Sequence, residues 1–270
     1  VATAGRGLSV PAIIGRESSL QAIRAAYDIA RRGRLRIVLC TGEPGIGKSH
    51  LLSAAADRLE SVGGRVLRGG ASEAEAMPPY LPFLEALTPV IRDTPAEELA
   101  ADVGPGAPAL STVFPELAAR IPSHLAASPL PPEQARLRLF QAMGATLAAV
   151  SSRRPLVLIL DDLQWADTAS LDLLTYIAGH QVSSRLLVLG AFQDAAVQTH
   201  PALARALVRL HRANRCETLQ LGPLDQAQTT ELARQLLGSE LSPECARALQ
   251  SHSEGNPFFA EELLRGWQHA

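Results

Sequence analysis

The chain has 270 residues, of which 47% are hydrophobic and 19% are charged, and its formal net charge is −2 at pH 7. These values are typical of an ordinary globular protein with one large domain or a domain and a half. They exclude the strongly basic character of a domain that binds nucleic acid with its whole surface.

The three cysteines, Cys40, Cys216 and Cys245, show no CxxC spacing, and the seven histidines show no paired ligand spacing. We therefore expect buried, unreactive thiols in a reducing, cytoplasmic setting and no metal held by Cys or His. No apolar run approaches the about 18 residues of a membrane span, so no membrane partner is expected. Because the first residue is Val rather than Met, we expect a piece of a longer protein.

Apolar runs bounded by turn residues alternate with helical patterns along the chain. Such alternation predicts an α/β fold, a doubly wound sheet of five parallel strands. The predicted strands are 34–42, 64–70, 155–162, 185–192 and 216–221. The predicted helices are 17–32, 48–61, 133–151, 168–180 and 201–212.

Two regions depart from this alternation. Residues 71–132 hold twelve of the nineteen prolines yet keep recurring Leu, Phe and Ile, which predicts an ordered helical insertion whose helices are limited by proline. From about residue 223 the pattern is helical throughout. We therefore expect a nucleotide-binding domain over 1–222 and a small helical lid domain over 223–270, truncated at its end.

Residues 42–49, G-E-P-G-I-G-K-S, match the phosphate-binding loop pattern G-x4-G-K-[ST], and Lys48 is the only lysine of the chain. The run follows a predicted strand and opens a predicted helix, which is the setting that this loop requires. A compact ammonium group fits a ring of backbone amides better than a planar guanidinium group does. The predicted nucleotide-binding residues of this segment are Gly42, Glu43, Pro44, Gly45, Ile46, Gly47, Lys48, Ser49 and His50; for His50, ordinary helix surface is the alternative.

The strand at 155–162 ends in two carboxylates, at the edge where open α/β sheets bind their ligands. We expect Asp161 and the Ser49 hydroxyl to hold Mg²⁺, and Asp162 to orient or deprotonate the attacking water. Strand-end acids that only form caps or surface pairs are the alternative. Asp167 is expected to cap the helix that follows.

The nucleotide class follows by elimination. A guanine-specific [NT]-K-x-D segment needs a lysine, and Lys48 is already used; no LSGGQ transporter signature occurs. Adenine nucleotide, ATP or ADP, is favoured.

Together, "IIGRESSLQAI" (13–23), the phosphate-binding loop, "LVLILDDLQWAD" (156–167), "LLVLGAFQD" (186–194) and "EGNPFFAEELL" (254–264) resemble the STAND-type ATPases, relatives of the AAA+ class. The similarity is greatest to the nucleotide-binding module of large ATP-binding LuxR-type transcription regulators, with the maltose regulator MalT a more distant relative. The resemblance implies that Ile14, Gly15 and Arg16 line the adenine pocket and that Pro257 of the lid touches the nucleotide. It also implies a module that switches between closed ADP and open ATP states.

The chain departs from this family at Gln193, where an arginine usually senses the γ-phosphate. A glutamine brings no charge, so we expect slow hydrolysis. The resemblance also makes Arg209, Arg212 and Arg215 candidates for an arginine finger; a solvated basic helix end is the alternative.

The sequence thus predicts an ATP/ADP-binding, slowly hydrolysing switch module of a LuxR-type regulator. It would contact DNA only through regions outside this chain, respond to an effector of unknown identity, and form nucleotide-dependent homo-oligomers. The alternatives are a nucleotide-loaded scaffold without useful turnover, supported by Gln193, and a AAA+ module of a cyclase, a kinase or a DNA-associated loader.

Overall fold

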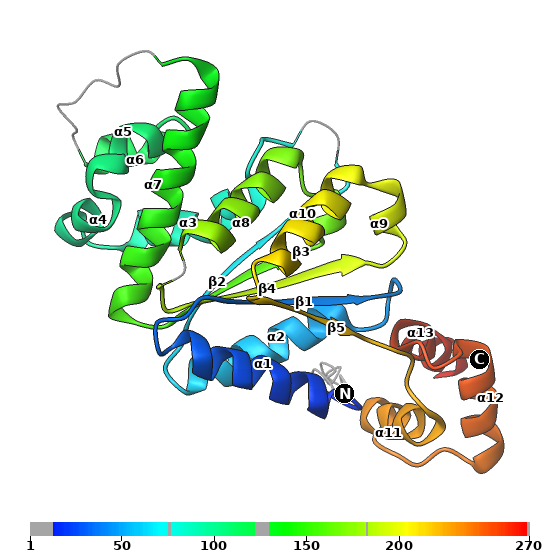
Figure 1. The fold of residues 1–270 in the computed structure, drawn as a ribbon. Coiled ribbons are helices and arrows are strands. Elements are labelled where there is room, and N and C mark those ends of the chain that lie inside the picture. Colours follow the sequence, from blue (N-terminus) through cyan, green and yellow to red (C-terminus); the bar gives the residue numbers. More distant parts are fainter. Residues whose placement is uncertain (1–12, 75–76, 122–129, 182, 269–270) are drawn as a thin grey trace, which may run out of the picture.

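The computed structural model describes residues 13–74, 77–121, 130–181 and 183–268. Within these ranges five strands form one parallel sheet with helices on both faces (Figure 1). The strands are β1 (Arg36–Gly42), β2 (Arg65–Gly70), β3 (Leu156–Asp161), β4 (Leu186–Gln193) and β5 (Cys216–Gln220), in the order β2-β3-β4-β1-β5. The expected α/β doubly wound sheet is therefore confirmed, and each strand lies within about two residues of its predicted bounds.

Alternate side chains of the central strands enter two different hydrophobic cores, as the two-residue repeat of a strand requires. In β1, Val38 and Cys40 pack with α1 (Glu17–Ala30) and α2 (Lys48–Ser61). Ile37 and Leu39 point to the other face. That face is covered by α3 (Leu81–Asp93), α7 (Pro132–Arg153), α8 (Thr168–His180) and α10 (Pro201–Arg212) (Figure 1). Burial on both faces explains the near-continuous apolar strand sequences.

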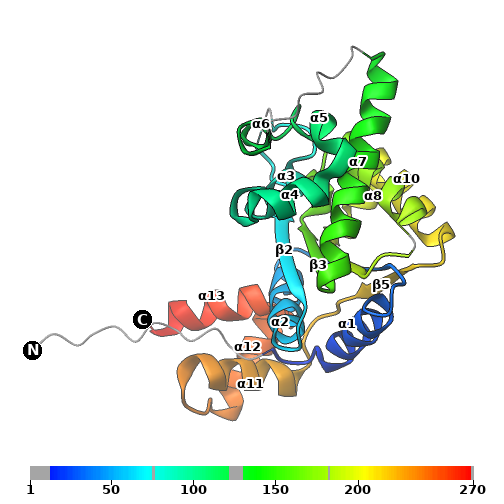
Figure 2. The same cartoon turned by 90° about the vertical axis from the view of Figure 1, so that its left-hand side faces the viewer.

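From Leu81 on, the described part of the insertion between β2 and β3 consists mainly of helices, as predicted for 71–132; residues 75–76 and 122–129 of that range lie outside the described residues. It rises above the sheet in Figure 2. Its elements are α3, α4 (Ala96–Val103), the 3-10 turn η1 (Gly104–Gly106), α5 (Ala107–Leu110), α6 (Pro115–Arg120) and the long α7. Pro115 and Pro132 begin helices, where the missing N–H costs nothing, whereas Pro89 lies inside α3. The prolines therefore start helices here more than they end them.

Three helices at the C-terminal end have a hydrophobic core of their own. They are α11 (Gln226–Leu237), α12 (Pro243–Ser253) and α13 (Pro257–Gln268). Leu232, Leu249 and Leu264 are buried between them, and Ile14 from the other end of the chain packs against this core. We propose, on the basis of this separate core, a division into a domain of residues 1–222 and a lid from residue 223. Residues 1–12 and 269–270 lie outside the described residues.

The carboxyl ends of the strands meet at one edge of the sheet. In the register of the strands, Gly42 of β1 lies opposite Gln193 of β4, and Asp161 of β3 lies opposite Gly70 of β2. Two short elements also follow strands at this edge, η2 (Leu163–Trp165) after β3 and α9 (Ala196–Thr199) after β4. Ligands bind at this edge in open parallel sheets, so the predicted site residues gather in one place.

Among the described residues, no helix combines the length and apolar character needed to cross a membrane.

Candidate nucleotide-binding site

The loop between β1 and α2 has the backbone shape that its glycines predict. Gly45 and Gly47 adopt left-handed conformations, with φ of +77° and +95°, which glycine accepts without the strain that a side chain brings. Gly47 also caps α2, so the first turn of that helix offers N–H groups without a partner in the helix. Such a helix N-terminus attracts phosphate through those N–H groups and through the helix dipole.

Lys48 folds back over this loop. Its Nζ donates hydrogen bonds to the carbonyl oxygens of Gly42, at 2.9 Å, and Glu43, at 2.8 Å. Burial lowers the pKa of the ammonium group, while Asp162, Asp161 and, less strongly, Asp194 raise it. The lone lysine therefore sits inside the loop with three carboxylates nearby, and a phosphate group can take the place of the two carbonyl partners.

Asp161 ends β3 beside the start of α2. Burial raises the pKa of its carboxyl group, whereas the Ser49 hydroxyl, the N–H of Asp162 at 2.9 Å and Lys48 lower it. The structure thus brings the hydroxyl of Ser49 and the carboxylate of Asp161 together, as the sequence predicted. Hard oxygen donors of this kind suit Mg²⁺, which proteins hold with one or two side chains plus phosphate oxygens and water.

A buried amide connects Asp162 to the neighbouring strand. The side chain of Gln164 donates a hydrogen bond of 2.7 Å from Nε2 to Asp162 Oδ1, and its Oε1 accepts one of 3.2 Å from the backbone N–H of Gln193. Gln164 is only 4% exposed, and Asp162 has a left-handed φ of +54°. Asp162 is thus held in a turn by a group that also contacts the end of β4.

The side chain of Gln193 projects from the face of the sheet that α2 covers. Leu187, Leu189 and Ala191 of the same strand pack in the core formed with α1 and α2. Because side chains alternate along a strand, Gln193 continues this series. It leaves the sheet opposite Gly42, at the beginning of the phosphate-binding loop.

Asp194 follows Gln193 and bonds to the end of β1, since the Thr41 hydroxyl donates a hydrogen bond to Asp194 Oδ1. The carboxylate lies near enough to Lys48 to raise the pKa of the ammonium group. Asp194 is therefore a third acid at this edge of the sheet, beside the predicted pair Asp161 and Asp162.

A small cavity of about 40 Å³ lies where the N-terminal segment, the start of α2 and the C-terminal helices meet. It is lined by Ile13, Ile14, Arg16, Ile46, Gly47, His50, Leu224, Leu232, Pro257 and Glu261. These include the predicted adenine-pocket residues Ile14 and Arg16, together with His50 and Pro257. Gly15 lies beside them, against the side chain of Gln228 on α11. A cavity of this size holds only a few waters, at about 10–15 Å³ each, so its walls must shift before it can accept a nucleobase.

Arg16 joins the loop to the segment that leads into the C-terminal helices. Its Nη2 donates hydrogen bonds to the carbonyl oxygens of Ile46, at 3.1 Å, and Gly222, at 2.8 Å. The guanidinium group is thus engaged with the backbone of both parts, and its burial lowers its pKa.

The start of α13 contacts the loop directly. Asn256 Nδ2 donates a hydrogen bond of 2.9 Å to the Pro44 carbonyl, and the N–H of Phe258 donates one of 3.3 Å to the Gly45 carbonyl. A Cβ at Gly45 would lie 2.8 Å from the Cβ of Phe258. The absence of a side chain at Gly45 is therefore needed for this close approach as well as for the turn.

The three candidates for an arginine finger lie away from the edge of the sheet that carries the loop. Arg215 precedes β5, and its carbonyl accepts a hydrogen bond from Ile37 near the start of β1, so it lies at the amino edge of the sheet. Arg209, exposed on α10, lies 3.8 Å from the carboxylate of Asp172 on α8. Arg212 ends α10, which supports the alternative of a solvated basic helix end.

Asp167 accepts hydrogen bonds from Ala169 and Ser170 at the start of α8, so its predicted role as a helix cap is confirmed. Of the cysteines, Cys40 is buried and Cys216 half-buried, and burial raises the pKa of each thiol to about 12. The expectation of a buried thiol is wrong for Cys245, because it lies on the outer face of the amphipathic helix α12 and is exposed.

A sequence profile described as the AAA ATPase domain matches residues 12–189, which is more than half of the chain. The chain belongs to the AAA ATPase domain family.

A curated relative of this AAA ATPase domain is the uncharacterized protein R02095 of Rhizobium meliloti (strain 1021), which is 28% identical over 273 aligned residues. The match includes 94% of this chain but only 25% of that protein, so the chain spans about a quarter of the length of its relative.

Solved structures with a similar fold include the replication initiator DnaA bound to AMPPCP and single-stranded DNA (TM-score 0.53, 14% identity, 95% of this chain and 62% of that chain). The Walker-type ATPase PABY2304 of Pyrococcus abyssi has a TM-score of 0.51 at 14% identity, over 92% of this chain and 65% of that one. A variant of Thermotoga maritima RuvB has a TM-score of 0.50 at 17% identity, over 93% and 61%. At these identities the similarity concerns the fold alone.

Three polar residues at the site of this AAA ATPase domain were missed by the sequence reasoning: Gln164, Asp194 and Asn256. Gln164 and Asp194 stand within segments quoted for the family resemblance, directly after two strands that end at the site. Their position just after these strands was the signal that could have identified both as site residues. Asn256 stands in the quoted segment 254–264, directly before Pro257, but the sequence did not indicate its partner Pro44, which lies 212 positions away.

Replacing Asp161 by alanine is expected to separate metal binding from nucleotide binding. If Asp161 holds Mg²⁺, the magnesium-dependent part of the ATP affinity is lost, while ADP without metal binds nearly as before. Burial raises the pKa of this carboxyl group, so it takes up a proton earlier than an ordinary aspartate as the pH is lowered. In the chain without the substitution, the magnesium-dependent affinity should therefore already be lost at a higher pH. Calorimetric titrations with and without Mg²⁺ across pH measure both effects.

The matched control is Asp57→Ala, which removes an exposed carboxylate from α2. It should change neither titration. Equal loss of ATP with metal and of ADP without metal in Asp161→Ala would instead assign a structural role to this strand end.

Proposed function

We propose that this AAA ATPase domain binds ATP and ADP with Mg²⁺ and acts as a slowly hydrolysing regulatory switch within a larger multidomain regulator, of the kind found among LuxR-type transcription factors. The STAND-like motifs of the sequence support this origin. The relative of about fourfold greater length is consistent with a module that works together with other regions. DNA would then be contacted by regions outside this chain, in the cytoplasm.

The observation that carries the switch proposal is the contact between the phosphate-binding loop and the C-terminal helices. Asn256 and Phe258 bond to loop carbonyls, and Arg16 ties the same loop to Gly222. The cavity between these parts holds only about 40 Å³. A nucleobase bound there lies between the loop and the C-terminal helices, so it can leave only when these two parts separate. Nucleotide occupancy and helix position are therefore coupled.

Within this proposal each residue has a role that fits its position. The N–H groups of the loop and Lys48 bind the phosphates, while Ile14, Gly15, Arg16 and Pro257 surround the base. The carboxylate of Asp162, held by Gln164, accepts a proton from the attacking water or orients that water. Ser49 and Asp161 would hold Mg²⁺, which neutralises charge on the phosphate oxygens when bound.

The switch is tested by releasing the latch between Asn256 and the loop. Asn256→Ala removes the hydrogen bond to the Pro44 carbonyl and the one that Asn256 accepts from the Phe258 N–H. Because the one hydrogen bond of Asn256 that reaches the loop is lost, at about 1 kcal/mol, release of a fluorescent N-methylanthraniloyl ADP should become about fivefold faster. Stopped-flow displacement by excess ADP measures this rate.

The matched control is Gln235→Ala. The side chain of Gln235 bonds to Glu231 within α11, and neither residue lines the cavity. Its release rate should stay near that of the unchanged chain. If both variants release ADP at the unchanged rate, the contact at Asn256 does not control the site and the switch proposal is wrong.

A further inference from the structure

A second and much larger hollow lies in the insertion, apart from the edge of the sheet that carries the loop. It is a groove of about 910 Å³ between α7 and the segment formed by η1 and α5. Val103, Leu139 and Ala142 line it and are buried, while Ala135 and Ala145 expose their methyl groups to it. Sites for small organic ligands commonly measure about 300–1,000 Å³ and are mostly apolar.

The charges around this groove have one sign. Arg136 and Arg138 both line it, and among the described residues no acidic side chain does so. Arg138 forms no ion pair within the described part of the chain, and Arg136 pairs with Asp172 outside the groove, at 3.3 Å. The groove therefore presents apolar surface next to two exposed guanidinium groups.

We propose that this groove binds a small amphipathic organic anion, with an aliphatic or aromatic body and one carboxylate or sulfonate group. The body would pack on Leu139 and Val103, and the acid would pair with Arg136 and Arg138. A neutral apolar molecule would leave Arg138 without an ion-pair partner among the described residues. An inorganic anion would leave the apolar walls in water.

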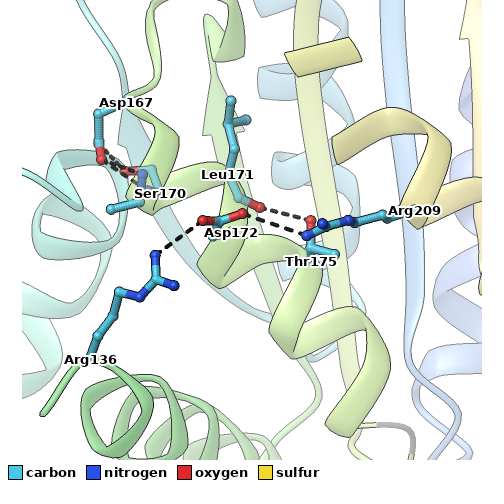
Figure 3. A network of polar contacts seen from close by, with 8 residues as sticks. Arg136, Asp167, Ser170, Leu171, Asp172, Thr175 and Arg209 are labelled. Atoms are coloured by element: carbon cyan, nitrogen blue, oxygen red, sulfur yellow. Dashed lines mark hydrogen bonds and ion pairs between the residues drawn. The ribbon is translucent and has the colours of Figure 1, made fainter. Parts of the chain in front are cut away.

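Two contacts link residues that line the groove to α8, the helix that follows the predicted metal-binding strand β3. Figure 3 shows Arg136 reaching from α7 to Asp172 on α8, with Arg209 on the other side of the same carboxylate. Tyr80 also lines the groove, and its backbone N–H donates a 3.1 Å hydrogen bond to Asp167, the cap of α8. A bound anion shares Arg136 with Asp172, so occupancy of the groove alters a contact of α8, whose cap lies a few residues after Asp162.

The test uses a matched pair of fluorescent probes without nucleotide, so that it is independent of the function proposed above. The anionic probe is 8-anilinonaphthalene-1-sulfonate, and the neutral probe is N-phenyl-1-naphthylamine, which has the same aromatic body without the sulfonate. The double variant Arg136→Gln, Arg138→Gln should weaken the anionic probe by about tenfold or more, because charge-assisted hydrogen bonds are lost. Its affinity for the neutral probe should stay within about twofold.

Two further variants locate the effect. Ala145→Trp fills the groove from the exposed face of α7 and should weaken both probes by about tenfold. Arg92→Gln removes an exposed guanidinium group from α3, which does not line the groove, and should change neither affinity. The double variant should fold, because both arginines are exposed and Asp172 keeps its contact with Arg209. Its melting temperature shows whether it does.

Several results would overturn the proposal. One is an anionic probe that does not bind, or that binds the double variant as well as the unchanged chain. Another is binding that appears only when residues 122–129 are replaced by a Gly-Ser linker, which would mean that the chain itself fills the groove. A third is a probe that binds the monomer at low protein concentration but not the larger species that light scattering detects at higher concentration. The groove would then be an interface between two copies.

Discussion

Replacing Lys48 by alanine is expected to abolish detectable binding of both ATP and ADP. In the structure the ammonium group lies inside the loop and bonds to the carbonyl oxygens of Gly42 and Glu43, with Asp161 and Asp162 nearby. A phosphate group that replaces these carbonyls would gain charge-assisted hydrogen bonds. Each is worth about 1.5–3 kcal/mol in a shielded site, or about 10- to 150-fold in affinity.

Isothermal titration with each nucleotide measures this loss. One variant serves as the matched control, and a second tests whether charge alone is sufficient. Arg58→Ala removes one positive charge from an exposed position near the end of the same helix, α2, and should bind nucleotide as before. Lys48→Arg keeps the charge but brings a planar group, and it should bind poorly if the loop requires a compact ammonium group. Unchanged affinity in Lys48→Ala would refute the assignment of this loop.

Loss of binding must be distinguished from loss of the fold. Lys48 stabilises the free loop through two hydrogen bonds to backbone carbonyls, and water can replace it at those oxygens in the variant. We therefore expect the free energy of unfolding to fall by no more than about 1.5 kcal/mol. A cooperative melting curve near that of the unchanged chain would show that the affinity change arises at the site.

The sheet was predictable because its signals are local. The runs that became β1, β3 and β4 are apolar on both faces of the sheet, and each ends at a polar or glycine-rich segment. The loop motif fixed the position of α2, and alternation of strands and helices fixed the parallel topology. The end of β4 lies beside the loop strand, where Gln193 pairs with Gly42.

Several of the unpredicted features depend on contacts between distant segments. The hydrogen bond between Thr41 and Asp194 spans 153 positions, and the one between Asn256 and Pro44 spans 212. Periodicity and motif spacing contain no information about such pairs. The groove beside α7 is another example, because its walls come from helices of the proline-rich insertion whose packing angles are set by side-chain shape.

Gln193 is expected to limit ATP hydrolysis, and Gln193→Arg to accelerate it or to increase the preference for ATP over ADP. Negative charge gathers on the phosphate oxygens during transfer, and an arginine that contacts them can raise the rate by about 10³- to 10⁵-fold. A neutral amide offers only a dipole. The unchanged chain should therefore turn over very slowly and keep ADP through purification.

The geometry favours an effect of this substitution. Gln193 leaves β4 on the face that α2 covers, opposite Gly42, and its backbone N–H is fixed by Gln164. An arginine here has the length to reach over the loop, where Lys48 and the first turn of α2 lie. Gln198→Arg is the matched control, because it adds the same charge at an exposed position of α9 after the same strand. It should leave the rate unchanged.

Phosphate release under single-turnover conditions measures the rate of hydrolysis. The dependence of this rate on protein concentration tests whether a second copy of the chain supplies the positive charge. The missing cation could also come from a neighbouring copy, through Arg209, Arg212 or Arg215. The rate of hydrolysis per molecule would then rise with protein concentration in the chain without substitutions, and would rise less in Gln193→Arg. If dilute protein already turns over faster than about one ATP per second, and Gln193→Arg does not alter that rate, the missing arginine has no consequence for hydrolysis. A rise confined to Gln193→Arg, with Gln198→Arg at the basal rate, would identify position 193 as the place where this chain restrains its own ATPase.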